Sequence, residues 1–254
     1  MAFYNLDAIV LRRSPLTETS FVVTFFSREM GKLSALAKGA RRKRNPFGAS
    51  LEPASHVRAI VVGRPTAELF QLRACELAER MEGLWGELGR IEGALYTVYL
   101  LDRLLKEREA EEALFGLSLR VLRGLARGDE VEGTLALFEL RLLALLGYQP
   151  PLEACPACGR PLAKGAAYLP GSGDLLCGRC ARSRPGARAL RPGSLEVMRA
   201  AARLPEEKLF QMRVVTPLRA ELREFARRSL SARLGVTLRE FALHGEGETT
   251  PPPP

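Results

Sequence analysis

The sequence predicts an α+β protein in which a small N-terminal β-barrel precedes a helical domain that carries an inserted cysteine-rich module. Three observations predict this class. The first eighty residues contain short apolar runs rich in Val, Ile, Phe and Leu. Beyond Trp85, apolar residues recur at steps of three and four, as on one face of a helix. Residues 148–192 are rich in Pro, Gly and Cys and contain two CxxC motifs. At 254 residues, the chain is long enough for several packed units.

The N-terminal runs predict five strands. They cover residues 6–13, 20–27, 32–38, 56–63 and 67–77. Gly31 supplies a turn between the second and third strands, and a segment from Pro46 to Pro53 separates the third from the fourth. Five short strands with a longer connection after the third suit a Greek-key barrel of the OB type. An SH3-like barrel is the alternative that this pattern leaves open.

The later periodicity predicts helices, which cover residues 91–105, 114–126, 130–146, 194–204 and 217–234. The third of these is apolar almost all round, which places it at the centre of a bundle. The predicted divisions are a barrel (1–80), a helical domain (81–150), a zinc-ribbon module (151–190), C-terminal helices (191–244) and a disordered tail (245–254).

The chain is basic, with a formal net charge of +9 and a pI near 9.7. Residues 1–80 carry thirteen basic against seven acidic side chains, residues 81–150 eight against twelve, and residues 151–192 seven against two. This uneven distribution indicates two cationic surfaces and a polyanionic partner. No segment has the length of apolar sequence that a membrane span needs, and the first residues do not resemble a signal peptide. We therefore expect a cytoplasmic protein without a membrane partner.

The two CxxC motifs predict a zinc site. They are separated by eighteen residues, a spacing typical of zinc-binding pairs, and tetrahedral Zn²⁺ needs four thiolates. Because four thiolates leave no open coordination position, the one zinc ion is expected to be structural. Two disulfides or unliganded cysteines are the alternatives, and a reducing compartment and the paired spacing weigh against them. The predicted ligands are Cys155, Cys158, Cys177 and Cys180, while Cys75 stands alone in a strand and is expected to be buried.

A dense basic segment follows the third predicted strand. It places five cations within seven residues: Lys38, Arg41, Arg42, Lys43 and Arg44. A loop of this charge density at the mouth of a barrel can follow a phosphate backbone. Gly39 permits close approach of the backbone, and Phe47 offers a face on which a base could stack. A solvated loop or a localisation tract is the alternative.

Two further basic groups are candidates for nucleic-acid contact. Arg12 and Arg13 end the first predicted strand, and Arg219, Arg223 and Arg227 recur at four-residue steps along the last helix. A solvated helix face explains the second group equally well. The cysteine module also holds a surplus of cations, which could extend the nucleic-acid footprint or bind an acidic protein. They are Arg160, Lys164, Arg179, Arg182, Arg184, Arg188 and Arg191.

Sequence motifs of enzymes are missing. No GxxxxGK(S/T) motif appears, and Leu176 stands where the third glycine of a GxGxxG motif starting at Gly171 belongs. The two histidines, His56 and His244, lie beside no candidate nucleophile or metal pair. We therefore expect a protein without catalytic residues.

Three segments resemble the bacterial recombination mediator family RecO. The segment AIVLRRSPLTETSFVVTFFSREMGKLSALAKGARRKRN resembles its N-terminal barrel, LALFELRLLALLGYQPPLEACPACG its central helix entering the zinc module, and LRAELREFARRSLSARLG its C-terminal helix. The resemblance implies an OB barrel, a helical domain and a zinc ribbon, with the C-terminal helices (191–244) packing on the helical domain. The family's DNA-binding loop matches Lys38, Arg41, Arg42, Lys43 and Arg44 in this sequence.

The resemblance also implies a function. Proteins of this family bind single- and double-stranded DNA and anneal complementary strands. With RecR, they help RecA to replace single-strand-binding protein during recombinational repair. The implied partners are therefore DNA, RecR, the acidic C-terminal tail of single-strand-binding protein and, indirectly, RecA, at the nucleoid. An RNA-binding or transcription-associated protein, and a scaffold for acidic protein tails, are the alternatives.

Overall fold

The computed structural model describes residues 1–162 and 165–235, which form two compact units. The N-terminal unit is Met1–Asp129, and the C-terminal unit begins at Glu130. His244 and the tail predicted to be disordered lie outside the described residues. Within these residues, no helix has the length and apolar character needed to cross a membrane.

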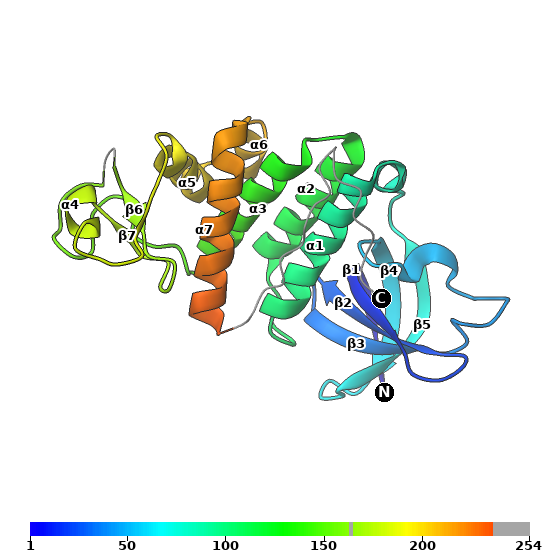
Figure 1. The fold of residues 1–254 in the computed structure, drawn as a ribbon. Helices are drawn as coiled ribbons and strands as arrows, with labels where there is room; N and C mark the ends of the chain where they lie inside the picture. The colour runs from blue at the N-terminus through cyan, green and yellow to red at the C-terminus, as the bar shows by residue number, and fades with distance from the viewer. Residues whose placement is uncertain (163–164, 236–254) are drawn as a thin grey trace. The chain divides into compact units, whose positions relative to one another are not determined.

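Five strands at the start of the N-terminal unit close into a barrel (Figure 1). They are β1 (Ala2–Pro15), β2 (Phe21–Ser27), β3 (Gly31–Ala37), β4 (His56–Gly63) and β5 (Leu69–Leu77). Their order around the barrel is β1-β2-β3-β5-β4, and β1 closes it by pairing with both β2 and β4. All pairs are antiparallel except β3 with β5. This order is that of the OB type, so the predicted fold class is confirmed and the SH3-like alternative is set aside.

The long first strand can join both sides of the barrel because it bends. Its first half pairs with β4 and its second half with β2, and the register shifts between Val10 and Arg12. A bulge of this kind bends a strand and increases its twist, which closes a small barrel. The interior is apolar and fully buried, with Phe25, Leu33 and Val57 at its centre. A short 3-10 helix, η1 (Gly48–Leu51), lies in the connection between β3 and β4.

Two helices complete the N-terminal unit. After η2 (Glu82–Gly86), the helices α1 (Leu88–Leu104) and α2 (Glu112–Arg127) pack on each other, and α1 contacts β1. Gly128 ends α2 in the left-handed conformation, with φ of 93°, and the backbone N–H of this residue donates to carbonyl groups of the last turn. Glycine favours this position because it carries no Cβ that would clash.

The C-terminal unit is a set of helices with the cysteine module inserted between them. α3 (Val131–Leu145) packs against α7 (Thr216–Leu234) and α5 (Ser194–Arg203), and α6 (Glu206–Leu209) precedes α7 (Figure 1). Leu135, Phe138 and Leu142 of α3 are fully buried, as the all-round apolar sequence indicates. The contacts thus group α3 with the C-terminal helices, whereas the five-part division drawn from the sequence stays a prediction.

The cysteine module contains little regular structure. Its strands β6 (Ala167–Tyr168), β7 (Leu175–Leu176) and β8 (Arg188–Ala189) form a small antiparallel sheet in the order β7-β6-β8. A single helical turn, α4 (Gly178–Ala181), contacts β6 and β7. β6 and β7 pair as a hairpin between the two CxxC motifs.

Candidate nucleic-acid interface and metal centre

The connection that leaves β3 carries the predicted basic segment, which we call the basic loop (residues 38–44). All five of its cations are exposed to solvent, and none forms an ion pair with a residue that the structure describes. Gly39 has a φ of +76°, and its carbonyl accepts the backbone N–H of Arg42 at 3.0 Å, which closes a tight turn. The contact of the five loop cations with DNA stays a prediction. The loop thus presents uncompensated positive charge on a defined backbone.

Arg41 holds the basic loop against the neighbouring loop between β1 and β2. Its guanidinium Nη1 donates to the carbonyl of Thr17 at 2.6 Å, and its backbone N–H donates to the carbonyl of Thr19 at 3.1 Å. The guanidinium carbon also lies 5.7 Å from the ring centroid of Phe21, the first residue of β2. Arg41 therefore orients the loop, and Lys38, Arg42, Lys43 and Arg44 remain for direct contact with an anion.

The aromatic residue beside the loop is not the one that the sequence suggested. Phe47 is only 8% exposed and packs into the barrel core, so its ring offers no face for stacking. Its backbone N–H donates to the side chain of Asn45 at 2.9 Å, which turns the chain inward. Phe21 is half-buried, and the guanidinium of Arg13 lies 5.1 Å from its ring centroid. In the sequence, the place of Phe21 at the start of the second strand was the only indication that its ring lies beside the basic loop.

The cations at the end of β1 are partly neutralised. Arg12 pairs with Asp102 at 3.0 Å and Arg13 pairs with Glu52 at 2.7 Å. Both lie on the part of β1 that pairs with β2. Exposed pairs of this kind are weak and can be exchanged for a phosphate contact. The contact of Arg12 and Arg13 with DNA stays a prediction.

The arginines of the last helix face the protein. Arg223 has a side chain only 6% exposed, with Nη1 2.7 Å from Glu132 and Nε 3.3 Å from Glu139. Arg219 pairs with Glu130 at 3.1 Å and donates to the carbonyl of Val214 at 2.7 Å. Arg227 donates to the carbonyl of Arg223 at 3.3 Å. A phosphate would have to displace these internal partners, and the guanidinium of Arg223 is out of its reach, so we omit Arg223 from the proposed interface.

The four predicted zinc ligands come together in the cysteine module. Their sulfur atoms all lie within 4.8 Å of one another, and Cys158 Sγ is 3.7 Å from Cys177 Sγ. Sulfurs at the corners of a tetrahedron with Zn–S distances of about 2.3 Å are about 3.8 Å apart. A disulfide needs about 2.05 Å, and all four cysteines are free thiols. The donor set and its spacing therefore fit one metal ion in a closed four-sulfur site.

The backbone at each CxxC motif prepares the sulfurs for a cation. Burial raises the pKa of Cys155, but backbone N–H donors from Cys177, Ala157 and Cys158 outweigh it and lower this pKa to about 6. The neighbouring thiols, Cys158 first, raise the pKa of Cys180 to about 12. All four sulfurs can thus be thiolates together only when a cation shares the site. Gly178 is required here, because a Cβ on it would lie 2.8 Å from the carbonyl oxygen of Gly165.

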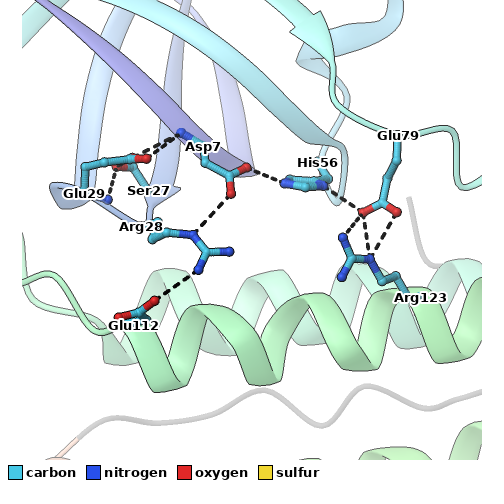
Figure 2. Close-up of polar contacts among 8 residues, drawn as sticks. All are labelled: Asp7, Ser27, Arg28, Glu29, His56, Glu79, Glu112 and Arg123. Carbon is cyan, nitrogen blue, oxygen red and sulfur yellow. Dashed lines mark hydrogen bonds and ion pairs between the residues drawn. The ribbon is translucent and has the colours of Figure 1, made fainter.

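Two residues that the sequence left without function have structural roles. Cys75 packs against the barrel core, and burial raises its pKa to about 11, so it is an unreactive thiol. His56 is buried between two carboxylates, with Nε2 2.5 Å from Asp7 and Nδ1 2.7 Å from Glu79 (Figure 2).

The histidine belongs to a chain of ion pairs that joins the barrel to α2. Arg28 links Asp7 to Glu112, and Arg123 binds Glu79 at 2.9 Å (Figure 2). The network therefore stabilises the arrangement of the N-terminal unit.

These features define a class: an α+β protein built on an OB-type barrel, with a basic loop and a four-cysteine cluster able to hold a metal ion. A family model described as "Recombination protein O N terminal" matches residues 1–81, and one described as "Recombination protein O C terminal" matches residues 86–240. The chain belongs to this family, and the family places it in DNA repair and recombination.

Individual relatives support the assignment. The DNA repair protein RecO of Symbiobacterium thermophilum is 39% identical over 78% of this chain and 79% of its own length. Its namesake in Pelotomaculum thermopropionicum is 34% identical over 96% of this chain and 94% of its own length. The protein of the same name in Anaeromyxobacter dehalogenans is 35% identical over 76% and 77%, respectively. Similarity therefore extends over most of each chain.

Proposed function

We propose that this chain is a recombination mediator that binds single- and double-stranded DNA and anneals complementary strands without catalysing a reaction. In this proposal it acts with RecR at the nucleoid to help RecA load onto DNA coated by single-strand-binding protein, whose acidic C-terminal tail it contacts. The observation that carries the proposal is the basic loop, with five exposed cations that have no acidic partner among the described residues.

The physical basis of annealing is the neutralisation of phosphate repulsion. Each cation that contacts a phosphate releases a condensed counterion, which makes binding independent of sequence and steeply dependent on salt. Because none of the loop cations forms an ion pair with a described residue, no ion pair has to be broken when the loop binds DNA. Arg41 supports this role because its bond to Thr17 orders the loop before DNA arrives.

The four-cysteine site supports a structural metal, which we propose to be zinc. Thiolate donors in a closed tetrahedral set favour Zn²⁺ and leave it no position for substrate. The ion, when bound, joins the two CxxC motifs and so holds the hairpin of β6 and β7 against α4. In this proposal, the metal shapes the module and takes no part in chemistry.

The test replaces Lys38, Arg42, Lys43 and Arg44 by Gln and measures binding to single-stranded DNA across a salt series. A matched variant replaces Arg103, Lys106, Lys208 and Arg213, which are also exposed, by Gln and removes the same charge elsewhere. We expect the salt slope of the loop variant to fall by about 0.7 for each lost contact, and that of the matched variant to stay unchanged. Equal slopes in the two variants would reject the interface.

Two further arms separate the proposal from its alternatives. RNA of the same sequence should bind no more tightly than DNA, whereas a strong preference for RNA would favour a transcription-associated role. Strand annealing on DNA coated by single-strand-binding protein, with and without RecR, tests the mediator role directly. A protein that binds the acidic tail but neither DNA strand would instead be a scaffold.

A further inference from the structure

The cysteine module carries a second cationic surface, formed by four of its arginines. Arg160, Arg179, Arg182 and Arg184 are exposed, and none forms an ion pair with a residue in the described part of the chain. Two other arginines of the module behave differently, because Arg188 pairs with Glu224 and Arg191 pairs with Glu221. The module therefore separates arginines that stabilise its packing from arginines that face only solvent.

All four arginines stand next to the CxxC motifs along the chain, because Arg160 follows the first motif, Arg179 lies within the second, and Arg182 and Arg184 follow it. The backbone carbonyl of Arg160 accepts the N–H of Cys155 at 2.8 Å, and Arg179 lies between Cys177 and Cys180. Because the four sulfurs lie within 4.8 Å of one another, the two CxxC motifs and the arginines beside them are neighbours. Arg182 and Arg184 follow directly, in the turn that ends α4.

The acidic residues of the module do not compensate this charge. Glu153 pairs with Arg203 at 2.8 Å and with Arg199 at 3.4 Å, both on α5. The carboxylate of Asp174 accepts a hydrogen bond from the hydroxyl of Ser172 at 2.7 Å. Both carboxylates thus have partners other than these four arginines.

The chemistry of the surface favours a phosphate backbone as its ligand. Guanidinium groups match phosphate oxygens in a bidentate manner, and every cation of this group is an arginine. None of the large exposed apolar side chains in the described residues belongs to the module. An acidic peptide with hydrophobic anchors would find no apolar contact here, whereas a polyanion needs none.

We propose that the cysteine module is a second DNA-binding surface, in which Arg160, Arg179, Arg182 and Arg184 contact the phosphates of a strand. This rests on the proposed function, since it assigns to the C-terminal unit a DNA contact separate from the basic loop of the N-terminal unit. Two separate phosphate-binding surfaces on one chain let a protein hold two strands and anneal them. The metal then acts indirectly, by keeping the arginines together.

The test uses full-length variants and a long single-stranded DNA in a salt series. The module variant is Arg182→Gln with Arg184→Gln, which leaves the CxxC motifs intact. Its matched control is Lys208→Gln with Arg213→Gln, two exposed cations of the same unit. Two lost contacts at about 0.7 each lower the salt slope by about 1.4, so a fourfold rise in salt should weaken the module variant about sevenfold less than the parent. The control should behave as the parent.

Adding the module substitutions to the loop variant separates the contributions of the two surfaces to DNA binding. In the variant that has Gln at Lys38, Arg42, Lys43 and Arg44, residual DNA binding at low salt should persist and should disappear when Arg182→Gln and Arg184→Gln are added. Annealing should fall in either variant alone. Metal content and thermal unfolding of each variant show whether it is folded.

Several results would overturn the inference. If the loop variant already shows no DNA binding at low salt, and the module variant binds and anneals DNA as the parent does, the basic loop is the whole interface. The proposed function then still holds. If the module variant loses metal but keeps its DNA affinity, the arginines stabilise the metal site and do not contact DNA. If it loses binding to polyglutamate but not to DNA, the surface takes an acidic protein. If no protein binds DNA, including the parent, the proposed function itself fails.

Discussion

Arg223 offers the sharpest test of how the C-terminal unit is held together. Its guanidinium lies between Glu132 and Glu139, and the side chain of Glu139 is completely buried. Replacing Arg223 by Met keeps most of the side-chain volume but leaves the carboxylate of Glu139 without its cation. Removing one partner of a buried pair costs about 3–5 kcal/mol, because the remaining charge is uncompensated. We expect a loss of this size in the free energy of unfolding, measured in urea by circular dichroism.

Two companion variants isolate the cause. In Arg223→Met with Glu139→Leu, no charge of the pair remains buried, and most of the lost stability should return. Arg219→Met breaks a more exposed pair with Glu130 and should cost less than about 1 kcal/mol. The reasoning fails if Arg223→Met is as stable as the parent, or if it lowers DNA affinity without lowering stability. The second result would make Arg223 a phosphate contact after all.

Three further predictions follow from the two units. A strong chelator should remove one metal ion per chain and unfold the cysteine module, seen as new protease sites within residues 151–190; a metal-free protein that resists protease there would contradict this. His56→Gln should lower the free energy of unfolding by about 1–3 kcal/mol, because Asp7 and Glu79 lose the side chain that hydrogen-bonds to both of them, and unchanged urea unfolding would argue against the network. Arg41→Lys keeps the charge but loses the bond to Thr17, so DNA affinity should fall more than in Arg42→Lys; equal effects would show that Arg41 does not orient the loop.

The barrel was predictable because its information is local. Each predicted strand overlaps the observed one, with ends that differ by at most a few residues, since apolar alternation and turn residues mark the boundaries. The closure of the barrel could not be predicted from local sequence patterns in the same way. The parallel pairing of β3 with β5 joins segments more than thirty residues apart, such as Ser34 and Leu69, and no local pattern encodes it. Only the count of strands and the long third connection hinted at it.

The cysteine site was the most predictable part of the chemistry. Its spacing alone indicates the ligand set, because two CxxC turns are geometrically suited to one tetrahedral ion. The arginines of the last helix were less predictable. The four-residue spacing of Arg219, Arg223 and Arg227 describes a helix face but does not say what covers it. The partners of Arg223 lie 84 and 91 positions earlier in the chain.

One signal for this packing was present in the sequence. Glu139 sits in a helix that is apolar almost all round, and a buried carboxylate in such a place needs a cation as its partner. A basic stripe on another helix was the natural source. Phe21, and not the expected Phe47, lies beside the loop for a similar reason. Which aromatic ring enters the core depends on how the connection after β3 folds back.

The difference between the basic loop and the last helix is therefore one of partners, not of composition. Both are rich in arginine, but α7 packs on α3, which with its N-cap supplies Glu130, Glu132 and Glu139, whereas the cations of the loop form no ion pair with a described residue. Clustered cations repel one another, so a protein gains nothing in stability from five of them on one short loop. Such a cluster gains energy only when an external polyanion arrives, and phosphates evenly spaced along a strand provide charge of the required sign and density.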